Sequence, residues 1–173
     1  IGGGIAGAAL AYHASRLGAR VTLLERGSCG CEASGLSAGT LYNLGKPAAV
    51  TSHNVNLYLR AESTEMLSQL PGCEFKQSGA LILAVTPAEA KHLRLEFESH
   101  LAAGLAVEWV EGLPNLCKLE PALAGGSALC AMHSPLSGSV QPMLATRAYA
   151  SAAAVAGCKV VEGVAVSCAR AKF

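Results

Sequence analysis

Glycines at the start of the chain constrain its fold more than any other feature. Residues 1–7, IGGGIAG, match the pattern GxGxxG. The glycine positions of this pattern are occupied by Gly2, Gly4 and Gly7. An amphipathic stretch at 8–17 ends at Gly18, and a hydrophobic stretch at 20–25 ends in the acid Glu25. Glycines placed in this way allow a tight turn and the approach of a pyrophosphate to a helix N-terminus, while the acid accepts ribose hydroxyls. The pattern therefore predicts a dinucleotide-binding turn, helix and strand.

Both ends of the chain indicate that it is a fragment. Only Ile1 precedes the glycines, although the complete pattern follows a full strand, and no initiator methionine is present. Residues 167–173 carry no signal for a final helix or turn. We therefore expect truncation at both ends of a chain whose 173 residues correspond to roughly one domain. A targeting signal would lie outside these residues.

Composition excludes several functional classes. The chain is 51% apolar and 14% charged, with a formal net charge of +1. This composition predicts a soluble globular protein without a nucleic-acid partner, for which an intracellular location is favoured and the compartment stays open. The small-residue stretch at 151–157 is too short to span a membrane. The seven cysteines are scattered and odd in number, and the spacing of Cys29 and Cys31 does not suit a metal. We expect free thiols and no metal site.

Further elements follow from periodicity and from turn and capping residues. The expected elements are a loop at 27–45, a helix at 57–70, a strand at 75–85 broken at Gly79, a helix from a Thr86–Glu89 capping box to 103, a strand at 107–110, a turn at 116–119, a strand at 128–132, a helix at 142–156, and strands at 159–162 and 164–168. This order predicts an α/β chain with a Rossmann-like nucleotide-binding domain that a mixed-sheet α+β insertion interrupts. We assign 1–50 to the first segment of the binding domain, 51–140 to the insertion and 141–173 to the return.

An ordered set of motifs resembles one family. The motifs are the glycine turn with Glu25-Arg26, ASGLSAG at 33–39, SGAL at 78–81, LEP at 119–121 and GSVQP at 138–142. Together they resemble the FAD-dependent amine oxidoreductases, which include glycine oxidase, D-amino-acid oxidase and the sarcosine oxidases and dehydrogenases. The resemblance covers essentially the whole chain. The first motif is shared by many nucleotide-binding folds, whereas the ordered set is specific.

The resemblance implies FAD as the cofactor and gives individual residues roles. The pyrophosphate would lie against the glycine turn, at Gly2, Gly4, Ile5, Ala6 and Gly7. Glu25 would accept the ribose hydroxyls with Arg26 beside it, Ser34 would lie near the phosphates, and Val166 near the adenine. Ala38, Gly39 and Thr40 would approach the isoalloxazine end, and Gly35 of the same loop is also expected to bind the cofactor. From the residues alone, Ser34 could instead cap a turn and Val166 could be ordinary core. Relatives that attach FAD through a histidine in this loop carry that histidine where this chain has Ser37, so this linkage is not expected here.

No set of histidines and carboxylates forms a convincing catalytic group. Structural roles are favoured for His13, His92, His100 and His133. His53 is more interesting because it follows the loop beneath the flavin, but we assign no catalytic residue.

The resemblance implies oxidation of a small amine or amino acid, in which hydride passes from the carbon bearing nitrogen to the flavin and the imine is hydrolysed. Oxygen or another acceptor would reoxidise the flavin. Two alternatives stay open: an NAD-dependent dehydrogenase, because Glu25 suits either ribose, and a truncated nucleotide-binding chain without activity. We expect the 173 residues alone to be inactive.

Overall fold

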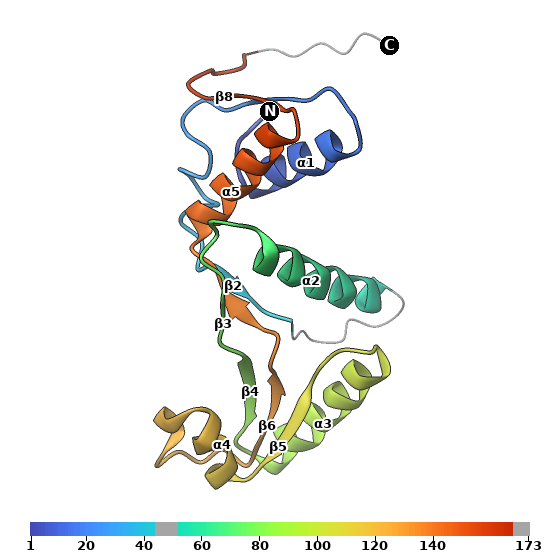
Figure 1. Cartoon of the computed structure of the whole chain (residues 1–173). Helices are drawn as coiled ribbons and strands as arrows, with labels where there is room; N and C mark the ends of the chain where they lie inside the picture. The colour runs from blue at the N-terminus through green and yellow to red at the C-terminus, as the bar shows by residue number, and fades with distance from the viewer. Residues whose placement is uncertain (44–51, 168–173) are drawn as a thin grey trace. The chain divides into compact units, whose positions relative to one another are not determined.

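The computed structural model describes residues 1–43 and 52–167. The chain divides into two compact units, the first formed by Ile1–Thr40, Leu67–Phe75 and Val140–Phe173 and the second by Leu41–Met66 and Lys76–Ser139. Figure 1 shows the order of their helices and strands. The assignment of a binding domain to 1–50 and 141–173, with an insertion at 51–140, stays a prediction.

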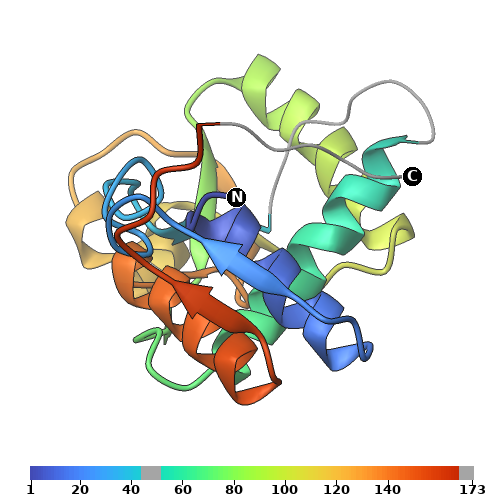
Figure 2. The same ribbon diagram turned by 90° about the horizontal axis from the view of Figure 1, so that it is seen from above.

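The first unit is built on two parallel strands, each preceded by a helix. Helix α1 (Ile5–Arg16) leads into β1 (Thr22–Leu24), and α5 (Pro142–Val155) leads into β8 (Lys159–Val161). The strands pair in parallel, and Figure 2 shows them side by side with both helices beneath them. The predicted helices at 8–17 and 142–156 and the strands at 20–25 and 159–162 are therefore confirmed, with ends shifted by a few residues.

Small side chains let α1 and α5 approach each other closely. The buried residues of α1 are Ala8, Ala11 and Ser15, and those of α5 include Ala145, Ala148, Ala150 and Ala153. Alanine favours the helix and leaves little side chain between two axes. Tyr149 of α5 packs against Tyr12 with ring centroids 5.8 Å apart, and against His13 at 6.3 Å. His13 thus contributes to the packing of the two helices.

The second unit contains an antiparallel sheet in the order β4–β6–β5. Its strands are β4 (Ala80–Ala84), β6 (Cys130–Ser134) and β5 (Glu108–Glu111). One face packs on α3 (Pro87–Ala102) through a cluster that includes Met132 and Phe97. The opposite face packs on α4 (Leu113–Leu119) through Ala131 and Leu116. Because successive side chains of a strand alternate between faces, β6 is buried on both sides.

Glycine and a capping box mark the expected boundaries in this unit. The predicted strand at 75–85 is broken at Gly79, which has φ +69° between β3 (Lys76–Gln77) and β4. The Thr86 hydroxyl accepts the Glu89 N–H at 3.2 Å, and the Glu89 carboxylate accepts the Thr86 N–H at 3.0 Å. Both features are confirmed. The remaining elements are β2 (Thr40–Leu41), α2 (Ser52–Gln69), the 3-10 turn η1 (Pro121–Leu123) and β7 (Gly138–Ser139), which pairs with β3.

Two expectations were wrong. The strand expected at 164–168 is absent over 164–167, and residue 168 lies outside the described residues. Gly163, with φ +75°, turns the chain out of the parallel ladder after β8. The turn expected at 116–119 is the end of a seven-residue helix, α4, which follows Gly112 at φ +77° and contains Pro114 in its first turn. So short a helix has too few residues for periodicity to reveal it.

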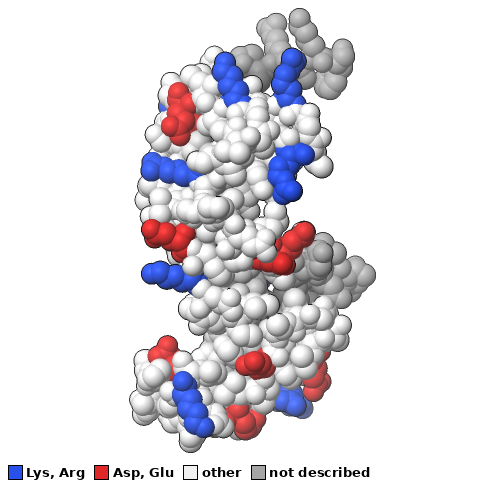
Figure 3. Space-filling view, viewed as in Figure 1, with Lys and Arg blue, Asp and Glu red and all other residues white. Residues whose placement is uncertain are grey.

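Acidic and basic side chains are scattered over the face shown in Figure 3, and the described residues there form no broad basic patch. Within residues 1–43 and 52–167, no helix is both long and apolar enough to cross a membrane. The same residues contain no group of three or more His, Cys or acidic side chains suited to a metal.

Candidate functional site

A pocket of about 440 Å³ lies in the first unit, at the N-terminal end of α1. It is lined by Ile1, Gly2, Gly4, Leu24, Glu25, Arg26, Ser28, Gly30, Cys31, Glu32, Ala33, Ser34, Val164, Ala165 and Val166. These residues come from the glycine turn, the end of β1, the loop that follows it and the segment after β8. The volume is within the range of pockets that hold small molecules and cofactors.

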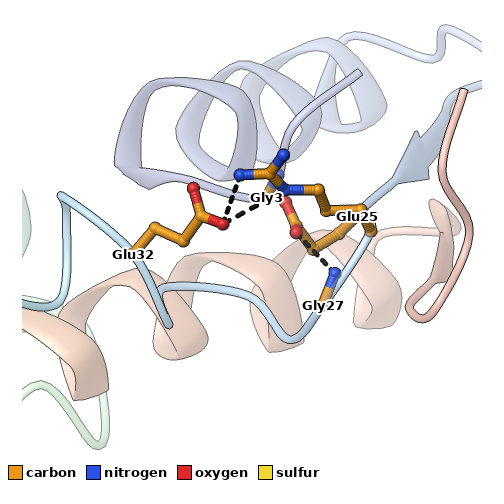
Figure 4. A network of polar contacts seen from close by, with 5 residues as sticks. Gly3, Glu25, Gly27 and Glu32 are labelled. Atoms are coloured by element: carbon orange, nitrogen blue, oxygen red, sulfur yellow. Dashed lines mark hydrogen bonds and ion pairs between the residues drawn. The ribbon is translucent and has the colours of Figure 1, made fainter.

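Glu25 links three parts of this pocket. One carboxylate oxygen accepts the Gly3 N–H at 2.6 Å, and the other accepts the Gly27 N–H at 2.8 Å, as Figure 4 shows. The hydrogen bonds from Gly27 and Gly3 lower the pKa of Glu25, so the side chain is ionised at neutral pH. Each carboxylate oxygen has a second lone pair for another donor. Glu25 therefore holds the glycine turn in place and keeps acceptor capacity for hydroxyl groups.

The first turn of α1 presents N–H groups towards the same region. The helical hydrogen bonds begin with the Ala8 N–H donating to the Gly4 carbonyl at 2.9 Å, so the N–H groups of residues 5–7 precede them. The Ile5 N–H donates to the Ser34 hydroxyl at 3.0 Å. A side-chain oxygen thus lies at the helix N-terminus, where the partial positive charge of the helix favours an anion.

Gly2 and Gly7 make this turn possible. Gly2 has φ +96°, which favours glycine, and its N–H donates to the Leu24 carbonyl at 2.8 Å. A Cβ added at Gly7 would lie 2.0 Å from the Gly2 carbonyl oxygen. A Cβ at Gly4 would instead meet the Ser34 hydroxyl at 3.0 Å, next to the pocket. Gly7 serves the close packing of helix and turn, whereas Gly4 leaves space at the pocket wall.

Arg26 and Glu32 form an ion pair along the pocket. Two nitrogens of the Arg26 guanidinium donate to one Glu32 oxygen, at 2.5 and 3.1 Å. The hydrogen bond with Glu32 raises the pKa of Arg26 above its usual value. Both side chains are well exposed, so the pair is open to water and salt.

The segment after β8 forms another wall. The Val164 N–H donates to the Glu25 carbonyl at 2.9 Å, which keeps residues 164–166 beside the acid. Val166, which was expected near the adenine, lies on the pocket wall. Its contact with a cofactor stays a prediction.

Sequence reasoning did not identify several lining residues: Ser28, Gly30, Cys31, Glu32, Val164 and Ala165. The signal that could have indicated the first four is their position in the loop directly after Glu25. Val164 and Ala165 carry no local signal, because they reach the pocket only through the pairing of β8 with β1.

Other expected residues do not line the pocket. These are Ile5, Ala6, Gly7, Gly35, Ala38, Gly39 and Thr40. Gly35 packs on the Gly30 carbonyl, where a Cβ would lie 1.8 Å from the oxygen, and Gly39 has φ +68° with its carbonyl accepting the Val140 N–H at 2.9 Å. These two glycines have clear conformational roles, and their contact with a cofactor stays a prediction. His53 belongs to α2, and its side chain lies outside the described part of the chain.

The two neighbouring cysteines differ in environment. Cys29 is buried, and burial together with Glu162 raises the pKa of its thiol to about 11. Cys31 is exposed and lines the pocket. Glu162 also accepts the Cys29 N–H at 2.6 Å, which ties the loop to the end of β8.

The arrangement suits a dinucleotide. A helix N-terminus favours phosphate, an ionised carboxylate accepts hydroxyls, and Gly4 leaves room for a close approach to the backbone. These features fit the FAD that the sequence resemblance implies.

Comparisons with known proteins agree with this arrangement. The profile of the FAD dependent oxidoreductase family matches residues 1–172. A glycine oxidase of Geobacillus kaustophilus is 30% identical over 169 residues, which cover 94% of this chain and 44% of that protein. The crystal structure of glycine oxidase from Geobacillus kaustophilus superposes with a TM-score of 0.74 at 29% identity, covering 94% of this chain and 45% of that one.

The fold is shared more widely. The structure of L-alpha-glycerophosphate oxidase from Mycoplasma pneumoniae with FAD bound gives a TM-score of 0.78 at 21% identity, covering 96% of this chain and 44% of that one. The chain thus spans less than half the length of these relatives.

Proposed function

The chain belongs to the family of FAD-dependent oxidoreductases, and we propose that the complete protein containing it oxidises a small amine or amino acid. The match to glycine oxidase over 94% of this chain supports the substrate class. The observation that carries the cofactor-binding role is the pocket in which the N-terminus of α1 and the Glu25 carboxylate lie together.

In this proposal different residues contact different parts of the cofactor. Gly2, Gly4, Ile5, Ala6 and Gly7 hold the pyrophosphate at the start of α1; Glu25 accepts ribose hydroxyls beside Arg26; Ser34 donates to a phosphate; Gly35, Ala38, Gly39 and Thr40 approach the flavin ring; and Val166 contacts the adenine. The Ser34 hydroxyl accepts the Ile5 N–H, and its own proton is free to be donated to a phosphate oxygen.

Bound FAD supplies the hydride acceptor that such an oxidation needs. The side chains of this chain bind and orient the cofactor, and we assign none of them to proton transfer. Reoxidation by oxygen or by another acceptor is part of the proposal.

A spectrum and a reduction test examine this function. The complete protein is expected to be yellow, with the absorption bands of oxidised flavin. Its flavin should bleach under anaerobic conditions with at least one of glycine, N-methylglycine, proline and the D-amino acids. Residues 1–173 alone should bleach with none of these. Absence of flavin from the purified complete protein would remove the proposal, and a nicotinamide in its place would support the dehydrogenase alternative.

Glu32→Gln should weaken FAD binding without unfolding the protein. The substitution removes the partner of Arg26 at the pocket wall, so the guanidinium loses its fixed position beside the nucleotide. Exposed ion pairs contribute little, so we expect the Kd for FAD to rise only about two- to fivefold at low salt, with the difference lost at high salt. Fluorescence titration measures both values.

Glu98→Gln is the matched control, since Arg94 and Glu98 form an exposed ion pair in the second unit, with a nitrogen–oxygen distance of 3.6 Å. Equal effects of the two substitutions on FAD binding would contradict a specific role for Glu32.

A further inference from the structure

A second pocket, of about 300 Å³, lies in the other unit on the α4 face of the sheet. Its apolar lining includes Leu81, Leu83, Leu119 and Leu123, and its polar lining includes Glu120 and His133. Leu83 and Leu119 are 37% and 47% exposed, because the short helix α4 covers only part of this face. All of its lining residues belong to the second unit, and its volume suits a small ligand.

Glu108 holds the His133 ring in one orientation. The two residues are direct partners on β5 and β6, and Nδ1 of His133 lies 2.9 Å from a Glu108 oxygen. A carboxylate only accepts hydrogen bonds, so the contact requires the proton on Nδ1. In the neutral ring Nε2 is then an acceptor. The His133 side chain is only 14% exposed.

The absence of a side chain at Gly79 leaves space next to Nε2 of His133. A Cβ at this position would lie 2.8 Å from Nε2. The backbone of Gly79 has φ +69°, and its N–H donates to the Ser137 carbonyl at 2.9 Å. The glycine that breaks the strand therefore also opens the histidine towards the pocket.

Two of the polar side chains of the pocket, Glu120 and His133, offer acceptors, while the Ser78 hydroxyl donates to the Gly79 carbonyl at 3.4 Å. Glu120 accepts the Ala122 N–H with one oxygen at 2.9 Å, and its second oxygen adds to the acceptor capacity of the pocket. None of the described lining residues is Lys or Arg. A ligand that complements this lining carries a cationic donor group on an apolar body. We propose that this pocket binds a small organic ammonium ion, whose nitrogen donates to His133 and Glu120 and whose hydrocarbon part contacts the leucines.

Imidazole NMR signals test the proposal in the complete, FAD-loaded protein with labelled histidine. The His133 signal is identified by its loss in His133→Gln. Benzylammonium should shift this signal saturably, whereas the isosteric benzyl alcohol should bind at least about tenfold more weakly, because it lacks the charge-assisted hydrogen bonds. Benzoate should not shift it. Flavin absorbance, recorded in parallel, reports separately on any binding at the cofactor.

Substitutions locate the site. Glu120→Gln keeps an oxygen for the Ala122 N–H and removes the charge, so it should raise the Kd for benzylammonium about tenfold. Gly79→Ala should abolish the response, but its backbone is strained, so Glu120→Gln is the decisive variant. Glu98→Gln, outside the pocket, should leave the Kd for benzylammonium unchanged. A His133 signal that does not respond to benzylammonium, or an unchanged Kd in Glu120→Gln, would overturn the proposal.

Discussion

Replacing Gly7 with alanine is expected to abolish FAD retention by the complete protein and to lower its thermal unfolding midpoint. The new Cβ would lie 2.0 Å from the Gly2 carbonyl oxygen, and Gly2 is itself bonded to the end of β1. Neither backbone segment can move without separating the helix from the strand. Since the helix N-terminus then moves away from the pocket, the N–H groups that we propose to bind the pyrophosphate are displaced and the packing of helix on strand is lost.

The sign of the expected change in stability distinguishes Gly7→Ala from an ordinary substitution of glycine by alanine in a helix. Glycine to alanine within a helix ordinarily stabilises by up to about 1 kcal/mol, so the expected result has the opposite sign. Gly4→Ala is the matched control: its Cβ would meet only the Ser34 hydroxyl, at 3.0 Å, and a side chain can rotate away. This variant should fold and bind FAD more weakly. Stoichiometric flavin in purified Gly7→Ala would contradict the close packing of helix and turn.

Glu25→Ala should raise the Kd for FAD at least tenfold. The carboxylate holds Gly3 and Gly27, and charge-assisted hydrogen bonds of this kind contribute about 1.5 to 3 kcal/mol each. In the proposed function, loss of the contacts of Glu25 with the ribose hydroxyls adds to the loss of the turn. Glu162→Ala separates the two causes, because Glu162 also accepts a loop N–H, from Cys29, but does not line the pocket. If both variants lost FAD equally in a fluorescence titration, Glu25 would have only a structural role.

The pH dependence of unfolding gives a second readout for Glu25. Hydrogen bonds from Gly27 and Gly3 lower its pKa in the folded protein below the usual value of 4.5. A lowered pKa contributes stability that is fully present above the unfolded value and is lost as the pH falls through the folded value. The difference in free energy of unfolding between wild type and Glu25→Ala should therefore be largest near neutral pH and shrink below about pH 4.5. Denaturant unfolding at a series of pH values measures it, and a constant difference would show that the carboxylate charge is not involved.

Local interactions made much of the fold predictable. The capping box of Thr86 and Glu89 and the break at Gly79 involve residues a few positions apart, and the structure contains both. The helix α4 was missed because seven residues are too few for periodicity. The strand at 164–168 was predicted from apolar residues alone, whereas Gly163 turns the chain away from the ladder.

The sequence by itself determined that a glycine turn, a helix and a strand ending in an acid follow one another, because the backbone freedom of glycine and the periodicity of apolar residues act over short distances. Only the tertiary structure decided which backbone groups this acid contacts. Glu25 reaches Gly3 across 22 positions of sequence, and Glu162 reaches Cys29 across 133. The pairing of β1 with β8 brings residues 164–166 to the pocket, and the pairing of β5 with β6 places Glu108 on His133. Such contacts depend on strand register and on packing between distant segments, which no local pattern of residues specifies.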